Sequence, residues 1–207
     1  AAGGSQTIQV SVDTTGKAPG VYRATLFIQT NSGRVPTLQV PVTLVVPAYY
    51  QAVNAGDGAY TDLAGDLWSA DQTYSTGSWG YTNSSSSVRM TTRAISGTND
   101  DKLYQSQRQT PTEYRFDGLP NGVYEVDLRF AELMNRRAGT RVYDVLIEGN
   151  FALPAHDTVA EVGIFAADQH VFFVPVTDGQ LNIRFVPRAG NAPPVVNAIQ
   201  VVERPDH

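Results

Sequence analysis

The chain has 207 residues, of which 42% are hydrophobic and 17% charged, and its 15 basic and 20 acidic side chains give a net charge of −5. This composition excludes a disordered chain, and the length suffices for one sizeable domain and a smaller segment. Without a basic stripe, no nucleic-acid partner is expected. The absence of cysteine excludes disulfides, thiol chemistry and zinc–thiolate sites.

Membrane insertion is not expected either. The longest apolar stretch, around residues 38–50, is interrupted by Pro41 and Pro47. It is shorter than the roughly 20 residues that a spanning helix needs.

Residues 1–47 are predicted to form three strands, at Gln6–Val12, Val21–Thr30 and Val35–Val46. Apolar residues alternate at period two in the second and third of these. Turn signals lie at Lys17–Gly20 and Asn31–Gly33.

The stretches GGSQTIQVSVD, APGVY and VPVTLVV follow one another in this segment. In this order they resemble the last part of bacterial immunoglobulin-like repeats. A full sandwich of that type has about seven strands, so we expect a partial immunoglobulin-like domain here. Its strand edges would need a partner, which a second copy could supply in a homodimer.

A second β-rich region is predicted at residues 48–207, after the boundary at Pro47. Explicit turn signals separate its short strands, which predicts an antiparallel β-sandwich or jelly roll. One short helix is expected at His156–Phe165, capped by Asp157 or Thr158. The predicted strands are Gln51–Asn54, Val88–Arg93, Leu103–Ser106, Glu113–Phe116, Gly122–Glu132, Thr140–Glu148, Gln169–Val176, Gly179–Val186 and Val195–Val202.

No catalytic or metal-binding motif stands out. His156, His170 and His207 show no i, i+4 pairing, so neither a metal site nor a cofactor is expected. Oxygen atoms of Asn99–Asp101 are a candidate for a structural calcium. No Gly-x-Ser-x-Gly elbow occurs, and no spacing pairs two carboxylates for glycoside hydrolysis. An enzyme is therefore not expected.

Aromatic residues gather in a Gly/Ser-rich region. Two interpretations stay open: the rings pack over the edge of the sandwich, or they face a ligand. A sugar suits the second, because it presents a C–H face to a ring and hydroxyls to polar groups. The residues are Tyr60, Trp68, Tyr74, Trp79 and Tyr81.

Several motifs in this region occur in a specific order. They are AVNAG at 52–56, WSAD at 68–71, GTxDDxLYQ at 97–105, RFAE at 129–132 and RVYDVxIEG at 141–149. Across roughly residues 49–203 they resemble the malectin family, carbohydrate-binding module family 57. The resemblance implies a jelly-roll-like β-sandwich that binds glucose-containing oligosaccharides. In bacteria such modules are commonly attached to secreted hydrolases, proteases or surface proteins.

The family binds sugar through loop aromatics and an acid, and this chain departs from that pattern. The aromatic pair after Ala-Glu is replaced by Met134 and Asn135, and the acid falls near Asn191 or Ala192. The implied ligand-binding residues are Trp68, Trp79, Tyr81, Met134, Asn135 and Asn191.

Two functional hypotheses follow. The first is a non-catalytic carbohydrate-binding module of a secreted or cell-surface protein. The alternative is a structural or protein-interaction module with a degenerate sugar site, which docks onto other domains of its parent protein.

Overall fold

The computed structural model describes residues 7–31 and 33–207, which fall into two compact units. The boundary between the units lies between Ala48 and Tyr49, while Asp206 groups with the first unit and His207 with the second.

The first unit contains an antiparallel hairpin of β1 (Gly20–Gln29) and β2 (Thr37–Val46), paired continuously along their length. The predicted strands at Val21–Thr30 and Val35–Val46 are confirmed within a few residues. The predicted strand at Gln6–Val12 is wrong over its described residues 7–12, and Gln6 lies outside the described part. Alternation alone does not make a strand, because a strand also needs a hydrogen-bonding neighbour.

The second unit is built on a six-stranded sheet in the order β13-β10-β16-β3-β5-β4. All neighbours pair antiparallel except β3 and β5, which are parallel. These strands are β3 (Tyr50–Asn54), β4 (Tyr60–Thr61), β5 (Leu67–Ala70), β10 (Gly122–Phe130), β13 (Asp168–Val176) and β16 (Ala198–Glu203).

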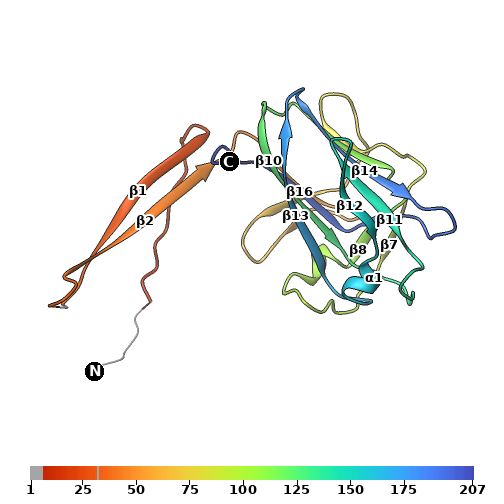
Figure 1. The fold of residues 1–207 in the computed structure, drawn as a ribbon, viewed down its shortest axis with the longest axis horizontal. Helices are drawn as coiled ribbons and strands as arrows, with labels where there is room; N and C mark the ends of the chain where they lie inside the picture. Colours follow the sequence, from red (N-terminus) through yellow and green to blue (C-terminus); the bar gives the residue numbers. More distant parts are fainter. Residues whose placement is uncertain (1–6, 32) are drawn as a thin grey trace. The chain divides into compact units, whose positions relative to one another are not determined.

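A five-stranded sheet faces it, in the order β12-β11-β14-β9-β6 (Figure 1). A smaller sheet, β15-β8-β7, completes the unit. The strands are β6 (Trp79–Tyr81), β7 (Ser87–Met90), β8 (Ser106–Gln109), β9 (Glu113–Asp117), β11 (Tyr143–Ile147), β12 (Asn150–His156), β14 (Gln180–Pro187) and β15 (Val195–Val196).

The core lies between the two larger sheets. In β10 every second side chain from Tyr124 to Phe130 is fully buried, and β11 contributes Tyr143, Val145 and Ile147 to the same cluster. This is the alternation that a half-buried antiparallel strand shows. The predicted all-β, jelly-roll-like sandwich is confirmed.

Local departures from the prediction have physical causes. The predicted strand at Leu103–Ser106 is wrong except at its last residue: a 3₁₀ turn spans Asp101–Leu103, and β8 begins only at Ser106. Leu103 and Tyr104 are consecutive and both buried, which suits a turn better than a strand, where neighbours face opposite sides.

The predicted helix at His156–Phe165 shrinks to one turn, α1 (Thr158–Glu161), because His156 belongs to β12. Asp157 caps this turn, as predicted, and its side chain accepts hydrogen bonds from the N–H groups of Val159 and Ala160. Among residues 7–31 and 33–207, no helix has the length and hydropathy that crossing a bilayer requires.

Candidate functional site

Trp68 is fully buried on β5, which corrects the expectation that it offers a ring face to a ligand. Its indole N–H donates to Oδ2 of Asp62 at 2.9 Å, and the guanidinium of Arg129 lies 4.5 Å from its ring centroid. The ring packs in an apolar cluster of buried side chains. Trp68 therefore supports the fold and lines neither of the surface hollows described below.

Trp79 and Tyr81 lie on β6, at the edge of the five-stranded sheet, and pack against the core. Tyr81 meets Tyr114 edge-on with ring centroids 6.1 Å apart. The guanidinium of Arg108 covers a face of the Tyr81 ring at 3.9 Å. The first of the two interpretations, packing over the sandwich edge, describes these rings.

Asp71 holds this edge together. Its carboxylate accepts hydrogen bonds from the N–H of Gly56 at 2.7 Å, from Nε of Arg108 at 2.8 Å and from the hydroxyl of Tyr114 at 3.0 Å. Burial raises the pKa of Asp71, against the opposing effect of the Arg108 charge. With every partner internal to the protein, this network locks the loops of that edge.

Met134 and Asn135, in contrast, line a surface hollow of about 380 Å³. An adjoining hollow of about 540 Å³ shares two residues with it, Met90 and Thr91. The remaining lining residues are Arg89, Arg93, Leu133 and Phe165 in the first hollow and Thr92, Lys102 and Gln105 in the second.

A buried carboxylate positions Met134. Oε1 of Glu132 accepts a hydrogen bond from the Met134 N–H at 2.9 Å, and Oε2 accepts from Nε of Arg141 at 2.7 Å. Glu132 is 1% exposed, so its charge depends on Arg141 for compensation. Arg136 donates to the Met134 sulfur at 3.6 Å. The Met134 backbone and thioether are thus both held in place.

Phe165 enters the hollow from the loop that follows α1. Its φ is +52°, a left-handed conformation that costs energy for a bulky side chain. Two backbone hydrogen bonds enforce it: its N–H donates to the carbonyl of Glu132 at 3.0 Å, and its own carbonyl accepts from the N–H of Ser96 at 2.9 Å. The guanidinium of Arg93 lies 4.4 Å from the Phe165 ring centroid.

Asn191 lies outside both hollows. Its Oδ1 accepts a hydrogen bond from the N–H of Val142 at 3.2 Å, so it shapes the loop before β11. Of the six expected site residues, the fold brings Met134 and Asn135 together in one hollow and leaves Trp68, Trp79, Tyr81 and Asn191 elsewhere. Sequence reasoning missed Arg89, Met90, Arg93 and Phe165, because no local pattern marks them as neighbours of Met134.

Asp100, one of the three candidate calcium ligands, has internal hydrogen-bond partners. Oδ1 of Asp100 accepts hydrogen bonds from the hydroxyl of Tyr60 at 3.1 Å and from the N–H of Leu63 at 3.0 Å. These bonds tie the loop after β4 to the 3₁₀ turn at Asp101–Leu103.

Comparisons with known proteins identify the family. The model of the Malectin domain matches residues 49–203. The crystal structure of Bacteroides uniformis β-glucuronidase is 27% identical, with a TM-score of 0.68 over 88% of this chain and 22% of that one. The ANXUR2 extracellular domain from Arabidopsis thaliana shares the fold, with 13% identity and a TM-score of 0.62 over 74% of this chain and 48% of that one.

The kinesin-like protein KIN-14E of Oryza sativa subsp. japonica is 34% identical over 74 residues, which are 35% of this chain and 7% of that protein. The chain thus spans about a fifth of the glucuronidase and a smaller part of the kinesin-like protein. Since the family model covers most of the sequence, in the same region as the sandwich, the chain belongs to the malectin family.

Proposed function

We propose that the chain is a non-catalytic carbohydrate-binding module, and that the hollow around Met134 and Phe165 is its binding site. The observation that carries the proposal is the lining of that hollow. Met90, Met134 and Phe165 supply apolar surface, and Thr91 and Asn135 supply hydroxyl and amide groups beside it. A sugar ring needs both kinds of surface in one place.

The charges of the residues that line the hollows indicate which class of saccharide would bind there. Arg89 and Arg93 line the first hollow and Lys102 lines the second, while no lining residue of either is acidic. Lys102 is partly compensated by Asp57 at 3.3 Å. A cationic surface on a chain of net charge −5 favours an oligosaccharide that carries carboxylate or sulfate groups over a neutral glucan.

The same lining supports a binding role over a catalytic one. Glycoside hydrolysis uses two carboxyl groups on either side of the bond to be broken, and the lining of the two hollows includes neither Asp, Glu nor His. We therefore assign binding by stacking and hydrogen bonds, on a secreted or cell-surface protein.

The test is calorimetric titration with a panel of neutral glucans, uronic-acid oligosaccharides and sulfated oligosaccharides at low and high salt. We expect acidic sugars to bind at low salt and Arg93→Ala to weaken that binding several-fold. Arg184→Ala, which removes an exposed arginine on β14, is the matched control. Binding that Arg184→Ala weakens as much as Arg93→Ala, or no binding to any sugar at millimolar concentration, would refute the assignment.

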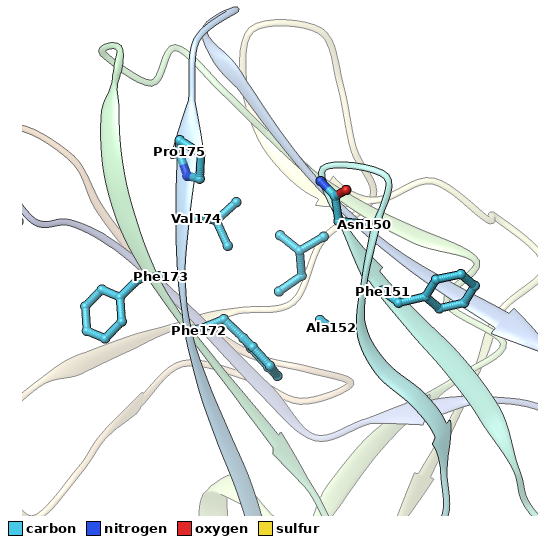
Figure 2. Close-up of a pocket in the computed structure, with 8 residues that line it drawn as sticks. Asn150, Phe151, Ala152, Phe172, Phe173, Val174 and Pro175 are labelled. Atoms are coloured by element: carbon cyan, nitrogen blue, oxygen red, sulfur yellow. The ribbon is translucent and has the colours of Figure 1, made fainter.

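A second function is favoured by a separate observation. An apolar groove of about 240 Å³ lies between β12 and β13, the edge strands of the two larger sheets (Figure 2). Figure 2 shows Phe172 turned into the gap and Phe151 turned away from it. Phe151 and Phe173 are 67% and 49% exposed. Exposed rings around a groove are typical of protein-interaction surfaces.

For this function we name one occupant, another domain of the same polypeptide, since the chain spans 22% of the glucuronidase that it resembles. Hydrogen exchange at residues 171–175 would be slower in a longer protein that includes the neighbouring domains than in this chain. Equal exchange rates in the two proteins would show that no neighbouring domain covers the groove.

The first unit fits a companion proposal. We propose that residues 1–47 are the last strands of an immunoglobulin-like domain, which is supported by the β1–β2 hairpin and its motifs. Its strand edges, within the described residues, pair with no further strand. Sedimentation of the chain would show a dimer if a second copy covers these edges, and a monomer at all concentrations would exclude that role.

A further inference from the structure

Two histidines and two carboxylates converge at the α1 end of the sandwich, away from the lining of both hollows. His156 ends β12, Glu161 ends α1, and Asp168 and His170 begin β13. One ligand atom from each of the four lies within 4.8 Å of the other three. Figure 1 shows α1 at this end of the unit.

Strand geometry explains the convergence. Asp168 and His170 are two residues apart on β13, so their side chains share one face. The short connection through α1 returns the chain from His156 to that same face. His156 and His170 consequently stand edge to face, with ring centroids 5.4 Å apart and planes at 90°.

Three distances between polar atoms of this cluster lie near the separation expected around a four-coordinate ion. Nε2 of His170 lies 2.8 Å from Oδ1 of Asp168 and 3.4 Å from Oε2 of Glu161. Nδ1 of His156 lies 3.3 Å from Oε1 of Glu161. A tetrahedral ion with bonds of about 2.1 Å separates its ligand atoms by roughly 3.4 Å.

Unsatisfied atoms provide an independent sign of a ligand. Asp168 is 5% exposed, and its Oδ2 has no hydrogen-bond partner among the described residues, although Nε2 of His156 lies 3.5 Å away. Nε2 of His170 is buried and lies 2.8 Å from Oδ1 of Asp168, but within the same part of the chain it has no well-directed hydrogen bond. A buried carboxylate oxygen and a buried imidazole nitrogen left in this state are costly, unless something between them accepts their lone pairs.

We infer that His156, Glu161, Asp168 and His170 bind a divalent transition metal, Zn²⁺ by preference. Two imidazole nitrogens select zinc-type ions over Ca²⁺, which takes six to eight oxygen ligands. The two carboxylates balance the charge of the ion. When Nδ1 of His156 binds the metal, Nε2 remains 3.0 Å from Oγ1 of Thr158, a hydroxyl that can accept a hydrogen bond from the Nε2–H group.

This metal site is structural. The side chain of His156 is fully buried and that of Asp168 is 6% exposed, while that of Glu161 is 42% exposed and forms the outer wall. The ion would join β12, α1 and β13 at both ends of the segment 156–170. Phe165 lies within that segment, so the metal would also restrain one wall of the first hollow.

The sequence does not predict that these histidines act together, because an i, i+4 pair marks only ligands that share one helix. Here the ligands come from two strands and one helical turn, and the Asp-x-His pair on β13 is the only local signal. The inference therefore differs from the sequence-based expectation of no metal site, and the experiment below decides between them.

The test uses the tag-free chain, freed of metal with a chelator and then titrated with Zn²⁺. We expect one ion per chain by elemental analysis, and the melting temperature should rise by roughly 5–10 °C at zinc concentrations near 100 times Kd. Co²⁺ in place of zinc should give the visible absorption of a four-coordinate site.

Two variants locate the ion. His170→Ala and Glu161→Gln should each weaken zinc binding at least 10-fold, and His207→Ala, which removes the third histidine, should leave it unchanged. Glu161 is exposed enough that its variant keeps the fold, and circular dichroism checks this for both. The inference is overturned if zinc raises no melting temperature, or if all three variants bind it as the parent does.

Discussion

In two aromatic regions of this protein, the positions of the rings differ from what the local sequence suggests. The ring-rich stretch from Tyr60 to Tyr81 lies among glycines and serines, yet Trp68 is fully buried and Tyr81 lies beneath Arg108. The hollow takes its ring from Phe165, in an unremarkable loop after α1. The difference teaches that packing of the sheets decides which rings are buried, because Trp68 lies inside an apolar cluster while Phe165 is half-buried against that same cluster and lines the hollow.

Trp68→Ala should have the largest effect. Removing a fully buried indole costs about 3–5 kcal/mol in the free energy of unfolding, because it leaves a large cavity. Urea denaturation measures this. Leu67→Ala, which removes an exposed neighbour on the same strand, should change stability by less than about 0.5 kcal/mol. If both variants cost the same small amount, Trp68 is not the interior residue described above.

Glu132→Gln should weaken both the fold and the hollow. Arg141 is 4% exposed and would lose its compensating charge, at a cost of about 3 kcal/mol. Met134 would also lose its charged acceptor. Urea denaturation and sugar titration would be run together, with Glu113→Gln as the control, since Glu113 pairs with Arg115, which is 40% exposed. Equal effects of the two variants would contradict the positioning role of Glu132.

Phe165→Ala should mainly affect sugar binding at the first hollow, whereas Trp68→Ala mainly affects stability. Loss of one stacking ring should weaken binding of an acidic oligosaccharide by about 2- to 10-fold, with a smaller change in stability than Trp68→Ala. Phe173→Ala is the matched control, because its ring is exposed beside the apolar groove. If Phe173→Ala weakened sugar binding more than Phe165→Ala did, the binding site would be at the apolar groove and not at the first hollow.

The smallest predicted effect is the pH dependence that Asp62, the hydrogen-bond acceptor of the Trp68 indole, gives to the free energy of unfolding. Burial acts to raise the pKa of Asp62, but hydrogen bonds from the Trp68 indole and from backbone N–H groups outweigh it and bring the pKa below 3.8. The ionised form therefore stabilises the fold above about pH 4, and this contribution is lost as the pH falls through the lowered pKa. We expect less than about 1 kcal/mol, and Asp62→Asn should remove it from the pH dependence of urea denaturation.

Much of the sandwich could be predicted from the sequence, because strand alternation and turn residues are local properties. The inward face of β10, the cap at Asp157 and the hairpin β1–β2 follow from neighbours within a few positions. Less could be predicted of the candidate site. Met134 and Asn135 were recognised through family motifs, whereas Arg93 and Phe165 join them through contacts between segments far apart in the chain.

The sequence by itself determined an all-β chain of the malectin family with turns and strands at defined places, since period-two alternation and glycine-containing turns act over a few residues. Tertiary structure alone decided that Trp68 is buried, that Phe165 faces a hollow and that His156 meets His170. Burial and proximity of this kind depend on how sheets pack on one another, and residues far apart in sequence carry no local signal of meeting.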